Sequence, residues 1–359
     1  MTALFDPLDL RGVRTRNRIW VSPMCQYSVT ERDGIPTDWH LVHLGSFARG
    51  GAGLVLAEAT AVTAEGRISP HDTGLWNDAQ VAAWRRITDF AHAQGAAIGV
   101  QLAHAGRKAS TWPAWGFPGE SGTVPAAEGG WQTVSASAIP FPGYAAPRAL
   151  ATDEVPGIVE AFRAGARRAL DAGFDLVEVH AAHGYLLHQF LSPLSNERDD
   201  DYGGSLENRA RLLLDVVRAV RAEVGDAVPV LVRFSATDYV EGGWDVEQTA
   251  AVAAWARDAG ADLFDISSGG LVSGVRIPTG PGYQVPLAES VAAEAHVRVS
   301  AVGLITEAHQ AADVVASGRA DAVMLGRELL RDPHFPLRAA TELGVELDYW
   351  PGQYLRARP

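Results

Sequence analysis

The chain has 359 residues, of which 30 are Lys or Arg and 43 are Asp or Glu, so its formal net charge at pH 7 is −13. This acidic balance, without any basic run, disfavours nucleic acid and anionic membrane surfaces as partners. Cys25 is the only cysteine, which excludes an internal disulfide and a metal cluster held by several cysteines. Without a leader pattern or an apolar run of membrane-spanning length, we expect a cytoplasmic protein with no membrane association.

A short phrase, a glycine followed by an apolar run, recurs along the chain. The glycine is typical of a helix C-terminus, and the uniformly apolar run is typical of a parallel strand buried on both faces. The phrase begins at Arg49, Ala93, Asp171, Asp258 and Ser317. Together with the remaining apolar runs it predicts eight strands, near residues 19–22, 54–57, 97–102, 176–180, 230–234, 263–267, 297–302 and 322–325.

Amphipathic segments between these runs predict the helical crossovers that parallel strands need. One apolar face contains Val81, Trp84, Ile87 and Ala91, and another contains Leu213, Val216, Val217, Val220 and Val224. Asp245 and Gln248 predict a capping box at the start of a later helix. Eight strand–helix units favour a (β/α)₈ barrel. A doubly wound open sheet is the alternative, but it would normally carry a glycine-rich fingerprint where this chain reads PMCQYSV.

Two segments interrupt the strand–helix alternation. Residues 106–150 are rich in Pro, Gly, Trp and Ser and have no helical period, which is typical of a lid or a binding loop. We expect this excursion to lie over the C-terminal end of the third strand. Residues 332–359 form a tail that could contact another subunit. The interpretation of the chain is therefore one barrel domain, 1–359, with a lid and a tail.

Barrel enzymes place their reactive groups at the C-terminal ends of the strands. His180, His183 and Tyr185 follow the fourth strand, where imidazoles can donate to a substrate oxygen and a phenol can deliver a proton. A capped turn with partly buried histidines is the simpler interpretation. A metal site is disfavoured because the nearest carboxylate, Glu178, is expected on the opposite strand face.

Further polar or glycine residues follow other strands. Arg233 ends an apolar strand, so it needs either an acidic partner or a reducible ring that becomes an anion. Gly303 and Gly326, each expected to open a helix, predict a phosphate site together with Arg327. Gln101 can both donate to and accept from the edge of a heterocycle, or be a satisfied core amide.

Ordered motifs along essentially the whole chain resemble one known family. They include SPMCQYS, VQLAHAGRKAS, HAAHGYLLHQFLSP, VRFSATD and MLGRELLRDP. They are similar to the motifs of the Old Yellow Enzymes, specifically the thermophilic-like bacterial ene-reductases, and also to those of the xenobiotic reductases. The resemblance implies a (β/α)₈ barrel with non-covalent FMN, which takes a hydride from NADPH, or from NADH, and passes it to an activated alkene.

The resemblance also implies a role for each motif residue. Residues lying against the flavin would be Ser22, Pro23, Met24 and Cys25, with Cys25 tuning its reduction potential. Ala59 and Gln101 would hydrogen-bond the pyrimidine side, Arg233 would stabilise the reduced ring, and the phosphate would be held by Gly303, Gly326 and Arg327. His180 and His183 would bind the carbonyl or nitro oxygen of the substrate, Tyr185 would protonate the substrate, and Tyr27 would line the pocket.

Arg356 resembles an arginine that reaches a neighbouring subunit's site, which implies a homodimer or homotetramer. Two positions depart from the family pattern. Residues 198–201 read RDDD where the family usually has RTD, a surface difference that we expect to be silent. Val302 replaces a tryptophan of the xenobiotic reductases, so their substrate range does not transfer. A metal-dependent barrel hydrolase and a non-catalytic flavin carrier are the alternative functions.

Overall fold

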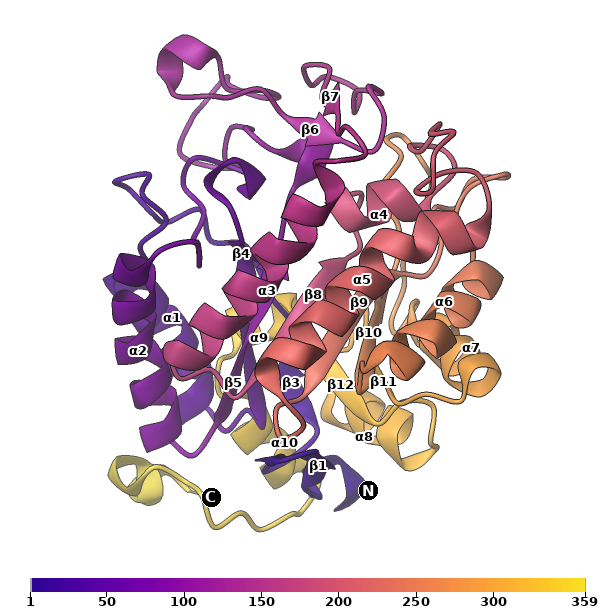
Figure 1. The fold of residues 1–359 in the computed structure, drawn as a ribbon. Helices are drawn as coiled ribbons and strands as arrows, with labels where there is room; N and C mark the ends of the chain where they lie inside the picture. The colour runs from indigo at the N-terminus through magenta and orange to yellow at the C-terminus, as the bar shows by residue number, and fades with distance from the viewer. Residues whose placement is uncertain (1, 359) are drawn as a thin grey trace.

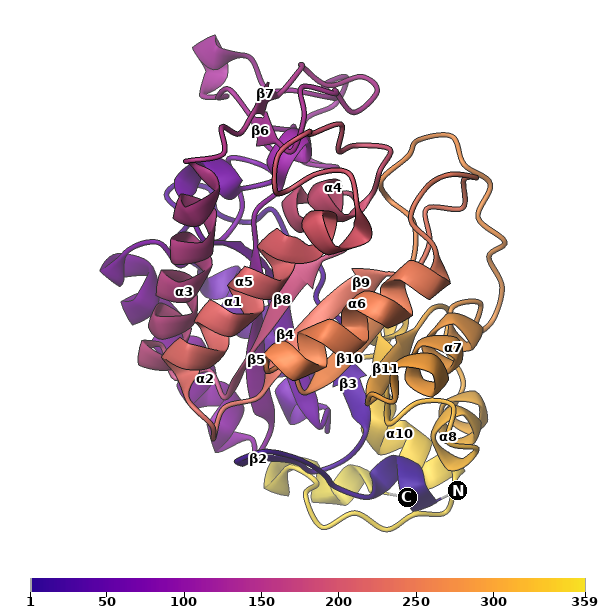
Figure 2. The same cartoon turned by 45° about the vertical axis from the view of Figure 1, so that its right-hand side comes forward.

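The computed structural model describes residues 2–358. Eight parallel strands in this range close into a barrel, with the helices arranged around its outside (Figures 1 and 2). The strands follow the chain around the barrel: β3 Ile19–Val21, β4 Leu54–Ala61, β5 Ala97–Ala103, β8 Leu176–Ala181, β9 Val230–Ser235, β10 Leu263–Ser267, β11 Val299–Val302 and β12 Ala322–Leu325. Each predicted strand is present, and the closed sheet excludes the doubly wound alternative.

The helices of the described chain are α1 Asp38–Arg49, α2 Asp78–Ala93, α3 Val155–Asp171, α4 Leu186–Leu191, α5 Leu206–Val224, α6 Val246–Ala259, α7 Val285–Ala295, α8 Ala308–Ala316, α9 Arg327–Arg331 and α10 Phe335–Glu342. Both predicted apolar faces, on α2 and α5, are buried against the barrel. Asp245 caps α6 by accepting from the Gln248 N–H at 2.9 Å. The reciprocal half of the predicted capping box does not form, because Arg209 and the Gly243 carbonyl bind the Gln248 side chain.

The barrel interior is closed at the N-terminal ends of the strands. Its lower layer is apolar and is covered by a hairpin of β1 Leu8–Leu10 and β2 Val13–Thr15. Inward-facing members of this layer are Trp20, Leu54, Leu56, Leu176, Leu231, Leu263, Ala322 and Met324. Because this end is filled, the polar strand ends at the opposite mouth form the accessible part of the interior.

The predicted excursion lies over that mouth, after β5 (Figure 1). It contains the short 3₁₀ turns Gly106–Lys108 and Ala126–Glu128 and a two-stranded sheet of β6 Val134–Ser135 and β7 Arg148–Ala149. Its base is fixed by Arg198, which donates to the carbonyls of Ala136 and Leu150. Of residues 198–201, Asp199 and Asp201 are exposed, as expected of a surface difference, whereas Arg198 pairs with Asp200 and anchors the excursion.

The C-terminal tail lies at the other end of the barrel (Figure 1). Its last turn, Gly352–Ala357, packs Tyr354 against His334 and the guanidinium of Arg49. Within residues 2–358 no helix combines the length and the apolar character that a bilayer crossing requires.

Candidate active site

The turn after β8 brings His180, His183 and Tyr185 together. The His180 ring lies edge-on to both other rings, with centroid distances of 5.3 Å to His183 and 5.0 Å to Tyr185. The Ala182 N–H donates to Nδ1 of His180 at 3.2 Å, so a neutral His180 carries its hydrogen on Nε2. Nε2 of His183 lies 2.8 Å from the Ser267 hydroxyl. The predicted trio is therefore a cluster of oriented rings at the mouth.

Burial controls the ionisation of this cluster. It lowers the pKa of both histidines well below the usual value, and the nearby Arg233 guanidinium lowers these pKa values further. Burial likewise raises the pKa of Tyr185 well above its usual value. At neutral pH all three side chains are uncharged, so the imidazoles can donate from one nitrogen each and the phenol retains its proton.

The tight turn itself depends on glycine. His183 has a φ of +56° and Gly184 a φ of +72°. A Cβ on Gly184 would lie only 2.5 Å from the Gly270 carbonyl oxygen, so no other residue fits without moving the backbone. The His183 N–H donates to the Ser235 hydroxyl at 2.9 Å, which fixes the turn to the end of β9.

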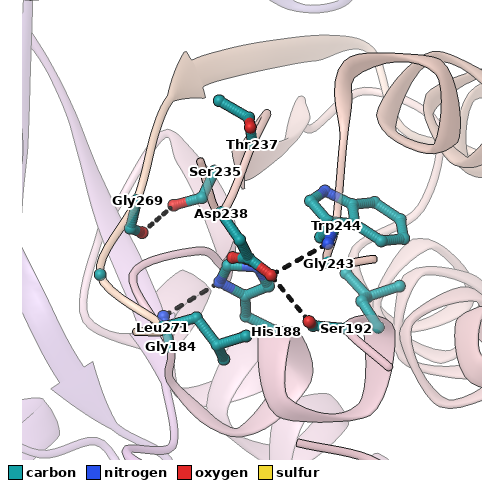
Figure 3. A network of polar contacts seen from close by, with 12 residues as sticks. Gly184, His188, Ser192, Ser235, Thr237, Asp238, Gly243, Trp244, Gly269 and Leu271 are labelled. Carbon is teal, nitrogen blue, oxygen red and sulfur yellow. Dashed lines mark hydrogen bonds and ion pairs between the residues drawn. The ribbon is translucent and has the colours of Figure 1, made fainter. Parts of the chain in front are cut away.

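A buried histidine–aspartate pair supports the same turn from behind (Figure 3). The Gly184 N–H donates to Nδ1 of His188 at 3.0 Å, and Nε2 of His188 lies 3.2 Å from Asp238. Asp238 also accepts from the Ser192 hydroxyl at 2.7 Å and the Trp244 N–H at 3.0 Å. Burial opposes the charge on Asp238, but these hydrogen bonds bring its pKa below the usual value. The sequence interpretation did not identify this pair.

Lys108 is a second residue that the sequence interpretation missed. Its ammonium donates to the carbonyls of His183 at 2.8 Å and Gly270 at 2.9 Å, and lies 5.1 Å from the centroid of the Tyr185 ring. Burial and the neighbouring Arg107 lower its pKa to about 8. Lys108 thus ties the turn to the β10–α7 loop. The sequence offered one signal that could have identified Lys108, namely its position shortly after the end of the third barrel strand.

The floor of the mouth is polar and charged. Arg233 lies 2.8 Å from Asp265 and donates to the Ser22 hydroxyl at 3.2 Å. Gln101 donates to Glu178 at 2.7 Å. The expected orientation of Glu178 was wrong: it faces the barrel interior, on the same side as His180, because residues two apart on a strand share a face. Asp265 was missed, although a charge inside an apolar strand is the signal that identified Arg233.

Gly303, Gly326 and Arg327 line one cavity at the ends of β11 and β12, which Val302 and Ser267 also line. The expectation that each glycine opens a helix was wrong for Gly303, because α8 begins only at Ala308. It was right for Gly326, which is the N-cap residue of the five-residue helix α9. Gly303 has a φ of +127°, and an added Cβ at Gly326 would first meet Met24, at 3.5 Å. The corner is therefore a cavity with bare backbone on two sides and a guanidinium beside it.

Cys25, Tyr27, Ala59 and Tyr185 belong to one small cluster at the side of the mouth. A bulge in β4 after Ala57 shifts the register at Ala59. Burial, with the carboxyls of Asp72 and Glu58, raises the pKa of the Cys25 thiol. Tyr27 has a φ of +49° and packs its ring 5.0 Å from that of Trp115 in the excursion.

Arg356 is the predicted residue that the fold does not bring to this mouth. It is exposed on the tail, at the N-terminal end of the barrel. The other predicted residues lie on the ends of the strands or on the segments that follow them. Within residues 2–358, no three His, Cys, Asp or Glu side chains come together as metal ligands would.

Comparison with known proteins shows which family the chain belongs to. The model of the NADH:flavin oxidoreductase / NADH oxidase family matches residues 3–346. The chain belongs to this family. The NADPH dehydrogenases of Listeria innocua and Geobacillus thermodenitrificans are 48% and 47% identical to it, over 99% of this chain in both comparisons and over 99% and 98% of the relatives.

Solved structures place the flavin oxidoreductase among enzymes of the same fold. Morphinone reductase superposes with a TM-score of 0.78 at 32% identity, covering 96% of this chain and 90% of that one. The Old Yellow Enzyme homologue of Zymomonas mobilis superposes with a TM-score of 0.79 at 30% identity, covering 99% of both chains. The resemblance to Old Yellow Enzymes is therefore confirmed, and the protein is an FMN-dependent oxidoreductase.

The residues at the mouth fit this cofactor. Arg233 is 5% exposed and its Nε has no aligned hydrogen-bond acceptor, although its charge is paired with Asp265. A buried cation of this kind suits a ring that gains negative charge. The cavity at Gly303 and Gly326 offers bare backbone and the Arg327 guanidinium, which suit a phosphate group.

Proposed function

We propose that this flavin oxidoreductase is an ene-reductase that uses NADPH to reduce the activated C=C bond of α,β-unsaturated carbonyl or nitro compounds. The observation that carries the proposal is the trio His180, His183 and Tyr185. The uncharged His180 ring lies 5.3 Å from the uncharged His183 ring and 5.0 Å from the protonated phenol of Tyr185, so the trio provides donors for one substrate oxygen and a proton for carbon. The names of the curated relatives, NADPH dehydrogenase, support NADPH as the reductant.

In this proposal, each residue of the trio has a separate role in the reaction. When bound, FMN supplies the redox chemistry, accepting a hydride from NADPH and passing it to the substrate. His180 holds the substrate oxygen through its Nε2–H. His183 adds a second donor, Nδ1–H, when the Ser267 hydroxyl donates to its Nε2. Both hydrogen bonds strengthen as negative charge develops on that oxygen. Tyr185 then delivers the proton to the α carbon from its hydroxyl.

Other residues shape the site around this chemistry. Gln101, Ala59 and Arg233 would bind the flavin ring, the segment 22–25 would lie against it, and Gly303, Gly326 and Arg327 would hold its phosphate. Cys25 would tune the reduction potential as a protonated thiol, in agreement with its raised pKa. Tyr27, with Trp115 of the excursion beside it, would line the substrate pocket. The excursion would serve as a lid.

The proposal extends to location and assembly. The lone thiol, Cys25, suits the reducing cytoplasm. The exposed position of Arg356, away from its own site, suits a homodimer or homotetramer in which it enters a neighbour's site.

The purified protein tests the proposal directly. We expect a yellow protein that releases one equivalent of FMN on heating, is reduced anaerobically by NADPH, and is reoxidised by cyclohexenone or a nitroalkene with formation of the saturated product. Bound FMN with no NADPH turnover would favour the carrier alternative. Turnover of NADPH with oxygen or quinones but with no alkene would limit the function to a dehydrogenase.

A further inference from the structure

A layer of polar side chains crosses the barrel interior between the apolar floor and the mouth. Its members come from five strands: Gln101, Glu178, Arg233, Asp265 and Ser300. All are at most 5% exposed. Arg233 contacts Asp265 at 2.8 Å, Ser300 donates to Asp265 at 3.3 Å, and Gln101 donates to Glu178 at 2.7 Å. Ionisable groups are thus enclosed where water has no access.

The charges of this layer do not balance when every group is ionised. Two carboxylates and one guanidinium leave one buried negative charge, which is costly in a low-dielectric interior. The two carboxyls also have unequal partners. Asp265 has the guanidinium and a hydroxyl, whereas Glu178 has one amide N–H on Oε1 and nothing on Oε2. This asymmetry assigns the charge to Asp265 and a proton to Glu178.

We propose that Glu178 is a neutral carboxylic acid in the working enzyme and that, acting through Arg233, it sets how the reduction potential of the bound FMN depends on pH. Glu178 is a positioning residue in this role, because it acts on the flavin through Arg233 and Gln101. The inference rests on FMN binding and does not depend on the proposed alkene substrates.

The surroundings of Glu178 support a high affinity for the proton. Burial and, to a lesser extent, the charge of Asp265 raise the pKa of Glu178, Arg233 and the Gln101 hydrogen bond act in the opposite direction, and the net result is a pKa of about 8. On its own strand, His180 is held neutral. The remaining facing strands add no charge to the layer. β5 and β11 contribute Gln101 and Ser300, and Ser22 directly follows β3. β12 has no ionisable side chain, and the one ionisable residue of β4, Glu58, pairs with His40.

Coupling follows from the position of Arg233. Negative charge on the reduced ring and negative charge on Glu178 would both compete for the same guanidinium. Reduction of bound FMN therefore raises the affinity of Glu178 for its proton, and by linkage an ionised Glu178 disfavours reduction. Below the pKa of Glu178 the residue is neutral in both redox states and has no effect. Above it, the reduction potential falls more steeply with pH.

Infrared spectroscopy of the oxidised holoenzyme tests the protonation directly. At pH 7 the wild-type minus Glu178→Gln difference spectrum should show the C=O stretch of a protonated carboxyl, because Gln keeps the shape and the bond to Gln101 but has no such group. Other buried carboxyls, such as Asp72, cancel in the difference. In the wild type alone this band should disappear as the pH rises through about 8. A carboxylate signal at pH 7 would overturn the proposal.

Potentiometry of the bound FMN tests the coupling. Wild type and Glu178→Gln should have the same pH dependence below about pH 7, and only the wild type should steepen above about pH 8. Glu294→Gln, an exposed change on α7, is the matched control and should behave as wild type. Parallel curves for wild type and Glu178→Gln at every pH would overturn the coupling. If Glu178→Gln does not fold, a wild-type curve with no steepening near pH 8 decides against it. Alkene reduction enters neither measurement, so its failure would leave this result intact.

Discussion

At the residue scale, burial decides which forms of the side chains are present at the mouth. His180, His183 and Tyr185 are all held uncharged at neutral pH, so this cluster presents hydrogen-bond donors and no charge. Such donors favour a neutral carbonyl substrate in the ground state and gain strength only as charge develops on its oxygen.

Tyr185→Phe tests the acid. The ring and its contact with His180 remain, so FMN binding and reduction by NADPH should be unchanged. Reoxidation by cyclohexenone should fall by roughly 10²- to 10⁴-fold, because a general acid is lost from the transition state. Stopped-flow reoxidation measures both. Nitroalkenes are the internal control, since their nitronate product can leave before the carbon is protonated. An equal loss on both substrates would assign Tyr185 to orientation only.

His180→Ala and His183→Ala test the donors. Each should weaken binding of phenols and enones by about 1–3 kcal/mol, because a buried oxygen loses a hydrogen bond. Reduction by NADPH should suffer less. Since both histidines have strongly lowered pKa values, phenol binding to the wild type should not change between pH 8 and pH 6. Titration of the phenol charge-transfer absorption would measure this. A loss of binding centred near pH 6.5 would show that the histidines protonate in the free enzyme.

Sequence alone identified residues by type and position but did not give their pairings. Arg233 was singled out as a cation inside an apolar strand, yet its partner Asp265 comes from the next strand, 32 positions later, and only the parallel pairing of β9 with β10 puts them in register. The face of Glu178 was misjudged, although the period of two in a strand was sufficient to place it beside His180.

At the element scale, the strands were the most predictable feature because each is a short apolar run, and five of these runs follow the recurring glycine phrase. The helix start after Gly303 was less predictable. Four residues separate Gly303 from α8, and the Gln310 side chain accepts from the Thr306 N–H and donates to the Leu304 carbonyl. Such side chain–backbone bonds depend on the folded loop, so no local pattern announced them. The turn after β8 likewise owes its shape to His188 and Asp238, which lie 50 residues apart.

Asp238→Asn tests that dependence. Removing the charge leaves His188 without its anionic partner and loosens the bond to Gly184, so the free energy of unfolding should fall by about 1–3 kcal/mol. Because the folded-state pKa of Asp238 is lowered, its stabilisation is complete above the unfolded pKa of about 4 and is lost as the pH falls below it. Denaturant unfolding should therefore show a difference between variant and wild type that shrinks in acid.

Ser192→Ala is the matched control for this change. It removes one hydrogen bond to Asp238 and leaves the contact between His188 and the carboxylate. Ser192→Ala should lower the free energy of unfolding by less than Asp238→Asn does, and it should leave the KM for cyclohexenone unchanged. Asp238→Asn should raise that KM, because it displaces His183. If Asp238→Asn were as stable as wild type at pH 7 and had an unchanged KM for cyclohexenone, the His188–Asp238 pair would not hold the turn.

At the scale of the whole molecule, different levels along the barrel axis carry different groups of residues. The N-terminal end is filled by the apolar layer and the β1–β2 hairpin, the middle carries the enclosed charges, and the C-terminal mouth carries the two histidines, Tyr185 and the cavity at Gly303 and Gly326. The tail is the exception, because its residues lie at the filled end. A functional Arg356 must therefore act on another copy of the chain.

Arg356→Ala tests this assembly. If Arg356 enters a neighbouring site, its loss should weaken substrate binding by about 10- to 100-fold, the value of a hydrogen bond to a charged group, while FMN stays bound. Arg358→Ala, two residues away and also exposed, is the matched control and should retain wild-type kinetics. Light scattering of the wild type should give a dimer or a tetramer at assay concentrations.

Complementation then distinguishes action across subunits from a local effect on the tail. In a hybrid of Arg356→Ala and Tyr185→Phe chains, one site combines an intact Tyr185 with an intact Arg356 from its neighbour, and the other site has neither. Co-expression of the two variants should therefore restore cyclohexenone reduction to part of the wild-type rate, although each variant alone is impaired. A monomeric wild type, or hybrids no more active than the mean of the two parents, would show that Arg356 does not complete a neighbouring site. The exposed charge of Arg356 would then need an explanation within one chain, starting from its neighbours in the turn Gly352–Ala357.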